Sequence, residues 1–354
     1  MKLRALGYAL LTGWLLLACS GVEQQDGGHA GGADSHAGTS QGGHSGDGGR
    51  PAEGGRAPTG GGSVAGGGGD DPVDGQLEPR GACATGKRTG RFSVEKQKDF
   101  GVVQGTILDG VVPTSIPELV SEQDGCKLFR RRNLSCSPAC VSSETCGETG
   151  KCIPYPAQIS VGGVLIEGLT KPVKMDPQRP GAVYFAPGQD NPPFVSDARV
   201  GLKASGADQV APFELFGRGS DPLPEAPTWV LEQGKALELA WPAGSDVTTV
   251  SVELTIDQHG STPLSLACEL PDNGSAQVPS TLIDDLIGSG VSGFPNGRIQ
   301  RRTVDHVDSA LGCVELSVGS VLAARVRVAG FTPCKSNQDC PSGTTCDPVQ
   351  ERCF

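Results

Sequence analysis

The sequence lacks the short motifs by which many enzymes are recognised. It has no Gly-x-Ser-x-Gly elbow, no Gly-Lys-Ser/Thr phosphate loop and no His-Glu-x-x-His zinc helix. Histidine, the commonest general base, is scarce: the chain has five, and only His259 and His306 lie outside the Gly-rich segment that ends near residue 80. These absences predict a protein that is not an enzyme and that uses no cofactor and no metal ion.

Two short pairs keep an extracytoplasmic hydrolase open as an alternative. Asp257 and His259 are two residues apart, so on a strand they would share a face as orienting acid and base. Gly260 follows directly, which favours an exposed histidine in a turn. Asp305 and His306 are adjacent and form the second carboxylate–histidine pair.

The segment Gly288–Gly293 matches the glycine spacing of a dinucleotide-binding turn by letter only. It follows a predicted helix rather than a strand, and Phe294-Pro295 excludes the helix that would point at a pyrophosphate. A flexible turn is the better interpretation.

Asp284 and Asp285 are neighbours on the predicted helix, so their side chains point about 100° apart. We therefore interpret them as the solvated face of the helix and not as paired catalytic acids.

Long apolar runs are also scarce, since only Ala5–Leu17, behind Lys2 and Arg4, is continuously apolar. A membrane span needs about 20 residues, so this run predicts a cleaved leader. It ends in Leu16-Leu17-Ala18-Cys19, which resembles the lipobox of bacterial lipoproteins. The resemblance implies that Cys19 carries diacylglycerol and a further acyl chain such as palmitate. An ordinary secreted protein with a stray cysteine is the alternative.

Ser20 follows Cys19, and in the lipoprotein family this resembles export to the outer membrane of a Gram-negative bacterium. The expected address is therefore the cell envelope, with the lipid bilayer as a partner through the acylated cysteine. Two or more acyl chains give stable anchoring, whereas a single chain gives marginal binding.

The chain has thirteen cysteines, an odd number, and setting Cys19 apart leaves twelve. An even set in an exported protein predicts disulfides. Four fall within 17 residues and four within the last 21, and both groups contain a Cys-x5-Cys spacing with Thr before the second cysteine, at Cys140–Cys146 and Cys340–Cys346. These segments resemble small EGF-like or Dickkopf-like modules, with four cysteines each.

Spacing alone permits three pairings in each module, and we predict the interlocked one. The predicted module bridges are Cys136–Cys146, Cys140–Cys152, Cys334–Cys346 and Cys340–Cys353. For the four remaining cysteines we predict Cys83–Cys126 and Cys268–Cys313. Zinc bound by four thiolates is the alternative for each module, but the close Cys-x-x-Cys pairs are missing and export favours oxidation.

Residues 20 to about 80 consist mainly of Gly with Asp, Ser, Ala and His, which predicts a disordered coil with a span of roughly 40 Å. His29, His36 and His44 alternate with aspartates and are the residues of an alternative metal-capturing tract. The coil offers no fixed geometry, so a tether that holds the folded head away from the membrane is the simpler interpretation.

The remaining residues predict a mainly β fold, an antiparallel Ig-like sandwich with disulfide-stapled modules. Residues 250–256 alternate apolar and polar side chains as in a half-buried strand. Further strands are expected at 159–169, 183–185, 200–204, 213–216, 237–241, 314–318 and 326–328. One short helix is expected at 281–287, with Leu282, Ile283 and Leu286 packing inward.

The net charge of −11 becomes −13 when the leader is removed, which argues against nucleic acid as a partner. Arg130-Arg131-Arg132 and Arg301-Arg302 are the basic clusters, and we interpret them as solvated faces.

The expected order is leader (1–18), tether (19–80), small β unit (81–134), first module (135–155), sandwich (156–332) and second module (333–354). Residues 81–135 alternatively complete the edge of the sandwich. The expected function is a membrane-anchored binding or adhesion module for an extracytoplasmic protein or glycan, with the loops 186–196 and 288–298 as candidate contacts. An accessory subunit of an envelope or secretion assembly is the other alternative.

Overall fold

The computed structural model describes residues 78–260 and 263–354, and 47% of these residues are in strands and 5% in helices. The predicted leader, Cys19 and all but the last residues of the predicted tether lie outside these ranges. The strands are β1 (Arg88–Lys96), β2 (Gly101–Ile107), β3 (Glu118–Gln123), β4 (Cys126–Arg130), β5 (Glu144–Cys146), β6 (Cys152–Pro154), β7 (Val164–Glu167), β8 (Val173–Met175), β9 (Tyr184–Gln189), β10 (Arg199–Ala204), β11 (Phe213–Arg218), β12 (Thr228–Leu231), β13 (Leu237–Ala240), β14 (Thr249–Thr255), β15 (Leu264–Pro271), β16 (Ser275–Val278), β17 (Asn296–Ser309), β18 (Gly312–Val328), β19 (Cys346–Asp347) and β20 (Arg352–Cys353). The helices are α1 (Ser280–Gly288) and two 3-10 turns, η1 (Pro113–Ser115) and η2 (Asn337–Asp339).

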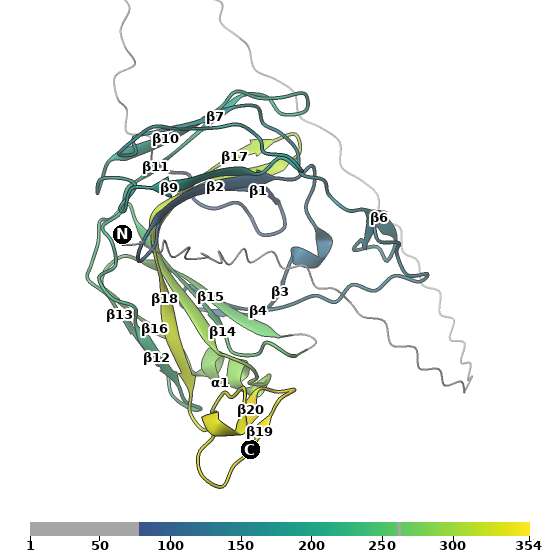
Figure 1. Cartoon of the computed structure of the whole chain (residues 1–354), viewed down its shortest axis with the longest axis vertical. Helices are drawn as coiled ribbons and strands as arrows, with labels where there is room; N and C mark the ends of the chain where they lie inside the picture. The colour runs from purple at the N-terminus through teal and green to yellow at the C-terminus, as the bar shows by residue number, and fades with distance from the viewer. Residues whose placement is uncertain (1–77, 261–262) are drawn as a thin grey trace, which may run out of the picture. The chain divides into compact units, whose positions relative to one another are not determined.

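A ten-stranded sheet organises the described chain, in the order β3-β4-β15-β14-β17-β18-β1-β2-β9, with β12 also paired to β18. Its spine is the hairpin of β17 and β18, which are 14 and 17 residues long. Figure 1 shows this hairpin running from the layer of β1 and β2 into the layer of β14 and β15. β18 pairs in parallel with β1 along its first half and with β12 near its end. One long hairpin therefore belongs to two packed regions.

The first packed region is a two-layer sandwich. The sheet β11-β10-β7-β8 covers the strands β1, β2, β9 and the first half of β18. The core between them includes Phe92, Tyr184 and Leu316, each with 0% exposure. Alternation places these side chains inward, because successive residues of a strand point to opposite faces.

The second packed region lies along the other half of the hairpin. Side chains of β4, β14 and β15 pack with β12, the small sheet β13-β16 and α1. Leu282, Ile283 and Leu286 of α1 are buried in this core, as their spacing predicts. The Asp284 carboxylate accepts a hydrogen bond from the backbone N–H of Gly234 at 2.6 Å.

The predicted class, a mainly β sandwich with disulfide-stapled segments, is confirmed. Residues 81–134 supply β1 to β4 to the ten-stranded sheet, so this segment completes the sandwich and does not stand as a separate unit. The strand expected over 159–169 is shorter, Val164–Glu167. It is followed by Gly168, whose φ is +81°. A Cβ at this position would lie 1.8 Å from the carbonyl oxygen of Arg199, so only glycine fits here.

Six disulfides join the twelve cysteines of the described ranges. The four module bridges follow the predicted interlocked pattern: Cys136–Cys146, Cys140–Cys152, Cys334–Cys346 and Cys340–Cys353. Each closes only 10 to 13 residues of sequence. A segment this short has almost no apolar core, so its order depends on the crosslinks.

The predicted pairing of the four other cysteines is wrong. The bridges are Cys83–Cys313 and Cys126–Cys268, with sequence separations of 230 and 142. The reason is the sheet order. Cys126 on β4 is the register partner of Cys268 on β15, and Cys83 precedes β1, which runs parallel to β18 from its start near Cys313. The prediction paired cysteines that are near in sequence. It is wrong because β1 and β4 pair with β18 and β15, which come much later in the chain.

Candidate binding site on the polar face of the large sheet

The face of the ten-stranded sheet that points away from both cores carries polar side chains. On β18, Val314, Leu316 and Val318 point into the core, so Glu315 and Ser317 point to the opposite face. Register extends this face to the neighbouring strands. We call it the polar face and define it by Arg91, Ser93 and Glu95 on β1, Glu315 and Ser317 on β18, Arg298, Gln300 and Arg302 on β17, and Ser251 and Glu253 on β14.

Ion pairs on the polar face join strands that are not adjacent. Arg298 on β17 reaches Glu95 on β1 at 3.0 Å, over the intervening β18. Arg302 on β17 pairs with Glu269 on β15, over the intervening β14. Second-neighbour strands lie nearly 10 Å apart in a flat sheet. Twist and curvature bring their side chains closer on a concave face, which favours ion pairs that pass over the strand between them.

Gly319 on β18 lies between the register partners Glu95 and Arg302. A Cβ there would lie 2.8 Å from the Cα and Cβ of Arg302. The missing side chain leaves room for Arg302 at the centre of the polar face.

Most of the polar face is buried. Ser317 has 0% exposure, Gln300 3% and Glu95 6%. Gln300 donates to the hydroxyl of Ser317 at 3.4 Å. Buried polar groups of this kind normally have hydrogen-bond partners, and unsatisfied ones call for an explanation.

The buried Nε atoms of Arg91, Arg298 and Arg302 on the polar face have no hydrogen-bond partner in the described chain. Arg298 and Arg302 pair with carboxylates through Nη2, whereas no ion pair of the described chain includes Arg91. Burial lowers the pKa of Arg91 below the usual arginine value, and the positive charges of Arg302 and Arg88 lower it further. Glu315 and Glu95 act in the opposite direction but do not offset this effect.

The basic cluster Arg301-Arg302, predicted as a solvated face, is buried. Arg301 has 2% exposure and lies on the core side of β17, where its guanidinium pairs with Asp272 at 2.7 Å. It also donates to the carbonyl oxygens of Asp221, at 3.2 Å, and Pro242. The prediction is wrong because cross-strand carboxylates neutralise both arginines, an arrangement that a single strand's sequence does not reveal.

We expect Asp272→Asn to lower the free energy of unfolding by about 3–5 kcal/mol, because it leaves the buried guanidinium of Arg301 without its counter-charge. Asp272 also accepts from Trp241 Nε1 at 2.9 Å and from the Thr248 hydroxyl. Urea titration measures the loss. The control is Glu232→Gln in the exposed pair with Lys235, where a change of at most about 0.5 kcal/mol is expected. Equal losses for both variants contradict the assignment.

The candidate catalytic pair Asp257 and His259 does not form a base and its orienting acid. The Asp257 carboxylate accepts hydrogen bonds from the Ser292 hydroxyl and from the backbone N–H groups of His259 and Gly260, at 3.2 and 3.0 Å. The ring of His259 instead lies 3.1 Å from Glu351 of the second module. This histidine lies in the turn between β14 and β15, as Gly260 predicts, and its contact helps to dock the module.

The Gly288–Gly293 segment belongs to the same docking region. Gly293 N–H donates to the carbonyl oxygen of Gln350 at 3.0 Å, and the Lys335 ammonium lies 5.2 Å from the ring centroid of Phe294. Part of the candidate loop 288–298 therefore contacts the second module. The other candidate loop, 186–196, begins within β9, and its Asn191 donates to the carbonyl oxygen of Lys98 at 3.2 Å.

The second candidate pair, Asp305 and His306, fastens the chain ahead of β1 to β17. Asp305 has 0% exposure and accepts from Arg80 Nε at 2.7 Å and Nη2 at 2.9 Å, and from the backbone N–H of Phe216 at 3.0 Å. His306 Nδ1 lies 2.9 Å from the carbonyl oxygen of Gly81. Burial alone would raise the pKa of Asp305, but the hydrogen bonds from Arg80 and Phe216 overcome it and hold the pKa below the usual aspartate value.

We expect Asp305→Asn to destabilise the protein near neutral pH by about 1.5–3 kcal/mol, the usual contribution of a hydrogen bond to a charged group. Because the folded pKa is lowered, the stabilisation is complete above the unfolded value of about 3.9 and is lost as the pH falls through the lower folded value. Melting temperatures of both proteins at pH 7 and pH 2.5 test this: the difference should shrink in acid. An equal difference at both pH values contradicts it.

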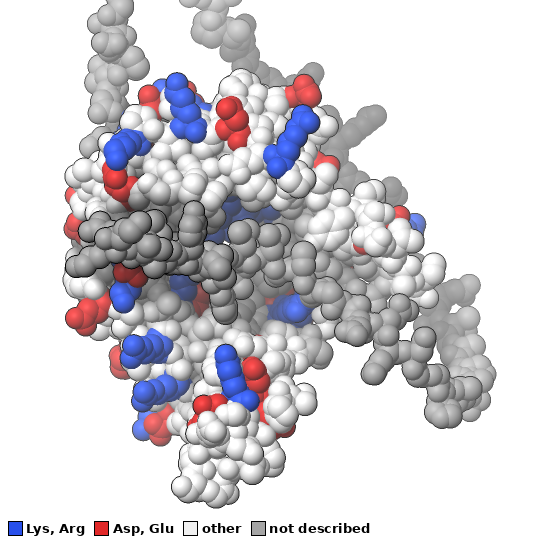
Figure 2. Space-filling view, in the orientation of Figure 1, with Lys and Arg blue, Asp and Glu red and all other residues white. Residues whose placement is uncertain are grey.

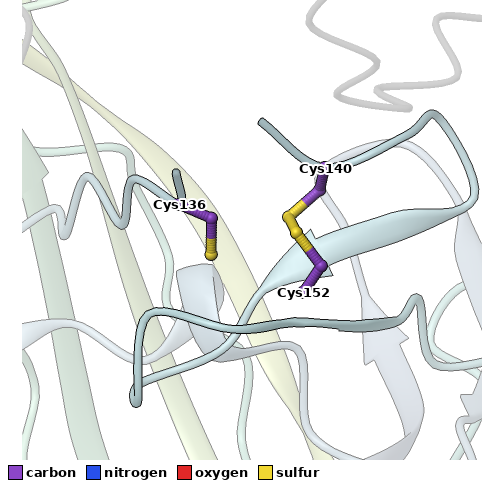
Figure 3. A group of neighbouring side chains, drawn as sticks. All are labelled: Cys136, Cys140 and Cys152. Carbon is purple, nitrogen blue, oxygen red and sulfur yellow. A yellow bond between two sulfur atoms is a disulfide. The ribbon is translucent and has the colours of Figure 1, made fainter. Parts of the chain in front are cut away.

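The cysteine modules contain the sulfur clusters that spacing suggested as zinc sites. In the described ranges, Cys136, Cys140 and Cys152 bring their sulfurs within 4.8 Å of one another, as do Cys334, Cys340 and Cys353. Figure 3 shows the first group, with Cys140 and Cys152 joined through sulfur. Zinc binds thiolates, and a sulfur in a disulfide is not one, so the oxidised modules do not offer a four-thiolate site.

A groove of about 600 Å³ lies on the outer sheet of the first packed region. It is lined by residues of β10 and β11, with Arg199 5.1 Å from the ring centroid of Phe216 and Lys203 paired with Glu167 at 3.0 Å. Figure 2 shows acidic and basic side chains interspersed on the visible surface. The groove is lined by three acidic residues and three basic residues, so its charges balance: Glu78, Glu167, Glu214, Arg80, Arg199 and Lys203.

No protein-family model matches the chain, and no curated protein does. Among solved structures, the chain has a likeness to the crystal structure of the FN1–FN3 domains of chicken CNTN1. The likeness has 7% sequence identity and a TM-score of 0.15, and covers 59% of this chain and 66% of that chain. A similarity of this size carries no conclusion about function. No helix in the described ranges is long and apolar enough to cross a membrane.

Proposed function

We propose that the protein is a lipid-anchored binding or adhesion protein of the cell envelope, at the outer membrane of a Gram-negative bacterium. Cys19 is the acylated residue, and the segment up to residue 80 links it to the β head. The binding surface is the part of the polar face around Arg91, next to the exposed side chains of Gln104 and Thr106 on β2, and its ligand is an extracytoplasmic protein or glycan. No catalytic step is part of this proposal.

The observation that carries the binding function is that the buried Nε atoms of Arg91, Arg298 and Arg302 on the polar face have no hydrogen-bond partner among the described residues. A sheet holds such groups in fixed positions, so little side-chain entropy is lost when a ligand binds to them. The geometry around His259 and His306 supports binding over hydrolysis, because each ring contacts a fastening segment: Glu351 for His259 and Gly81 for His306.

The six disulfides of the described ranges support the location. Disulfides form and persist in exported proteins and are rare in the cytosol. The anchor itself is tested by Cys19→Ser, which should move the protein from the membrane fraction to the soluble fraction.

A further inference from the structure

We propose that Arg91 binds the carboxylate of an acidic sugar. This inference rests on the proposed binding function and names the class of its ligand. The site consists of the end of β1 and the facing residues of β17 and β18 on the polar face.

The arginines near Arg91 on the polar face are paired with carboxylates. Arg88 pairs with Glu315 at 3.3 Å, Arg298 with Glu95 at 3.0 Å, and Arg302 with Glu269. Within residues 78–260 and 263–354, Arg91 forms no such ion pair, and its Nε, like those of Arg298 and Arg302, has no hydrogen-bond partner. A partly buried guanidinium with an unsatisfied donor costs free energy, and an incoming anion that accepts from this donor lowers that cost.

The shape of the side chain selects an oxyanion. Guanidinium presents a planar fork of N–H donors that matches the two oxygens of a carboxylate. Glu315 and Glu95 lie close enough to Arg91 to affect its charge. Their negative charges penalise a dianion such as phosphate more than a single carboxylate, so a carboxylate is the better fit.

The residues around Arg91 favour a sugar as the carrier of that carboxylate. Thr106 on β2 is the register partner of Arg91, and Gln104 is the partner of Ser93. Thr106 and Gln104 are exposed. Hydroxyl and amide groups in a row beside a guanidinium complement the hydroxyls and carboxylate of a uronic acid.

The test measures binding to the chain from residue 19 onward, with Cys19→Ser so that no lipid is attached. The probes are penta-galacturonate, its full methyl ester, hexa-glutamate and inorganic phosphate, titrated by calorimetry. Penta-galacturonate should bind, and the methyl ester should not. Arg91→Gln should weaken binding roughly 10- to 100-fold, as expected for loss of a charge-assisted hydrogen bond.

Stability separates a binding arginine from a structural one. Burial and two neighbouring positive charges disfavour the charged form of Arg91, so the melting temperature of Arg91→Gln should not fall, and Arg91→Lys should retain part of the affinity. The matched control is Lys203→Gln, on the outer sheet in a pair with Glu167, which should leave binding unchanged.

Unchanged affinity of Arg91→Gln, or absence of penta-galacturonate binding, overturns the inference. Tighter binding of hexa-glutamate or of phosphate overturns the choice of ligand. Equal binding of the methyl ester, independent of Arg91, also overturns this site while leaving a binding function and the Cys19 anchor in place.

Discussion

Replacing both cysteines of the Cys126–Cys268 bridge by alanine should lower the free energy of unfolding by roughly 5 kcal/mol, against roughly 3 kcal/mol for a bridge within one module. The bridge links β4 to β15 with a sequence separation of 142, whereas Cys340–Cys353 spans 13. In the chain-entropy model, a longer closed loop restricts the unfolded chain more. Cys126 and Cys268 are also almost fully buried, at 0% and 1% exposure, so alanine leaves a gap in the core.

Urea titration of the Cys126→Ala/Cys268→Ala protein measures this loss, and Cys340→Ala/Cys353→Ala is the matched control. The control should destabilise the second module alone, by the roughly 3 kcal/mol expected for its short loop, and leave the main transition of the sheet nearly unchanged. If both variants lose the same stability in the main transition, or if the long bridge can be removed without loss, the account of the long disulfides is contradicted.

Cys19→Ser should transfer nearly all of the protein from membranes to the soluble fraction. Each buried methylene of an acyl chain contributes about 0.8 kcal/mol to membrane binding, and two or more chains make the anchor stable. Serine at this position has no thiol to receive diacylglycerol. Because the proposal assigns anchoring to this residue alone, its replacement should remove the whole anchor.

Local patterns predicted the elements that depend on neighbours in sequence. The alternation at 250–256 corresponds to β14, Thr249–Thr255, and the apolar spacing at 281–287 corresponds to α1, Ser280–Gly288. The interlocked module disulfides were also predicted, and their partners lie only 10 to 13 residues apart. In each case, the interactions that decide the structure lie within one short segment.

Long-range pairing decided what the sequence did not predict. Cys83 pairs with Cys313, 230 residues away, because β1 and β18 run in parallel. The expected strands at 314–318 and 326–328 are one strand, β18, since β17 pairs with residues 312–325 and β12 pairs with residues 325–328. Arg301 looked like a surface residue because its partner, Asp272, lies on a neighbouring part of the fold.

Arg91 was not among the candidate residues for the same reason. It precedes Phe92 in an ordinary alternating strand, and nothing near it in sequence marks a site. Its importance appears only when the sheet brings Arg88, Arg302 and Glu315 around it and pairs the other arginines with carboxylates. Charged residues at polar positions of a predicted central strand are the signal that would have indicated it.

The most direct test of the proposed anchoring compares wild type with Cys19→Ser, and with Ser20→Ala as the matched control, by membrane fractionation followed by mass measurement of the N-terminal peptide. The proposal predicts that wild type and Ser20→Ala are found in the membrane fraction with a peptide that begins at an acylated Cys19, and that Cys19→Ser is soluble. Membrane retention of Cys19→Ser, or a wild-type peptide with an unmodified Cys19, would contradict it.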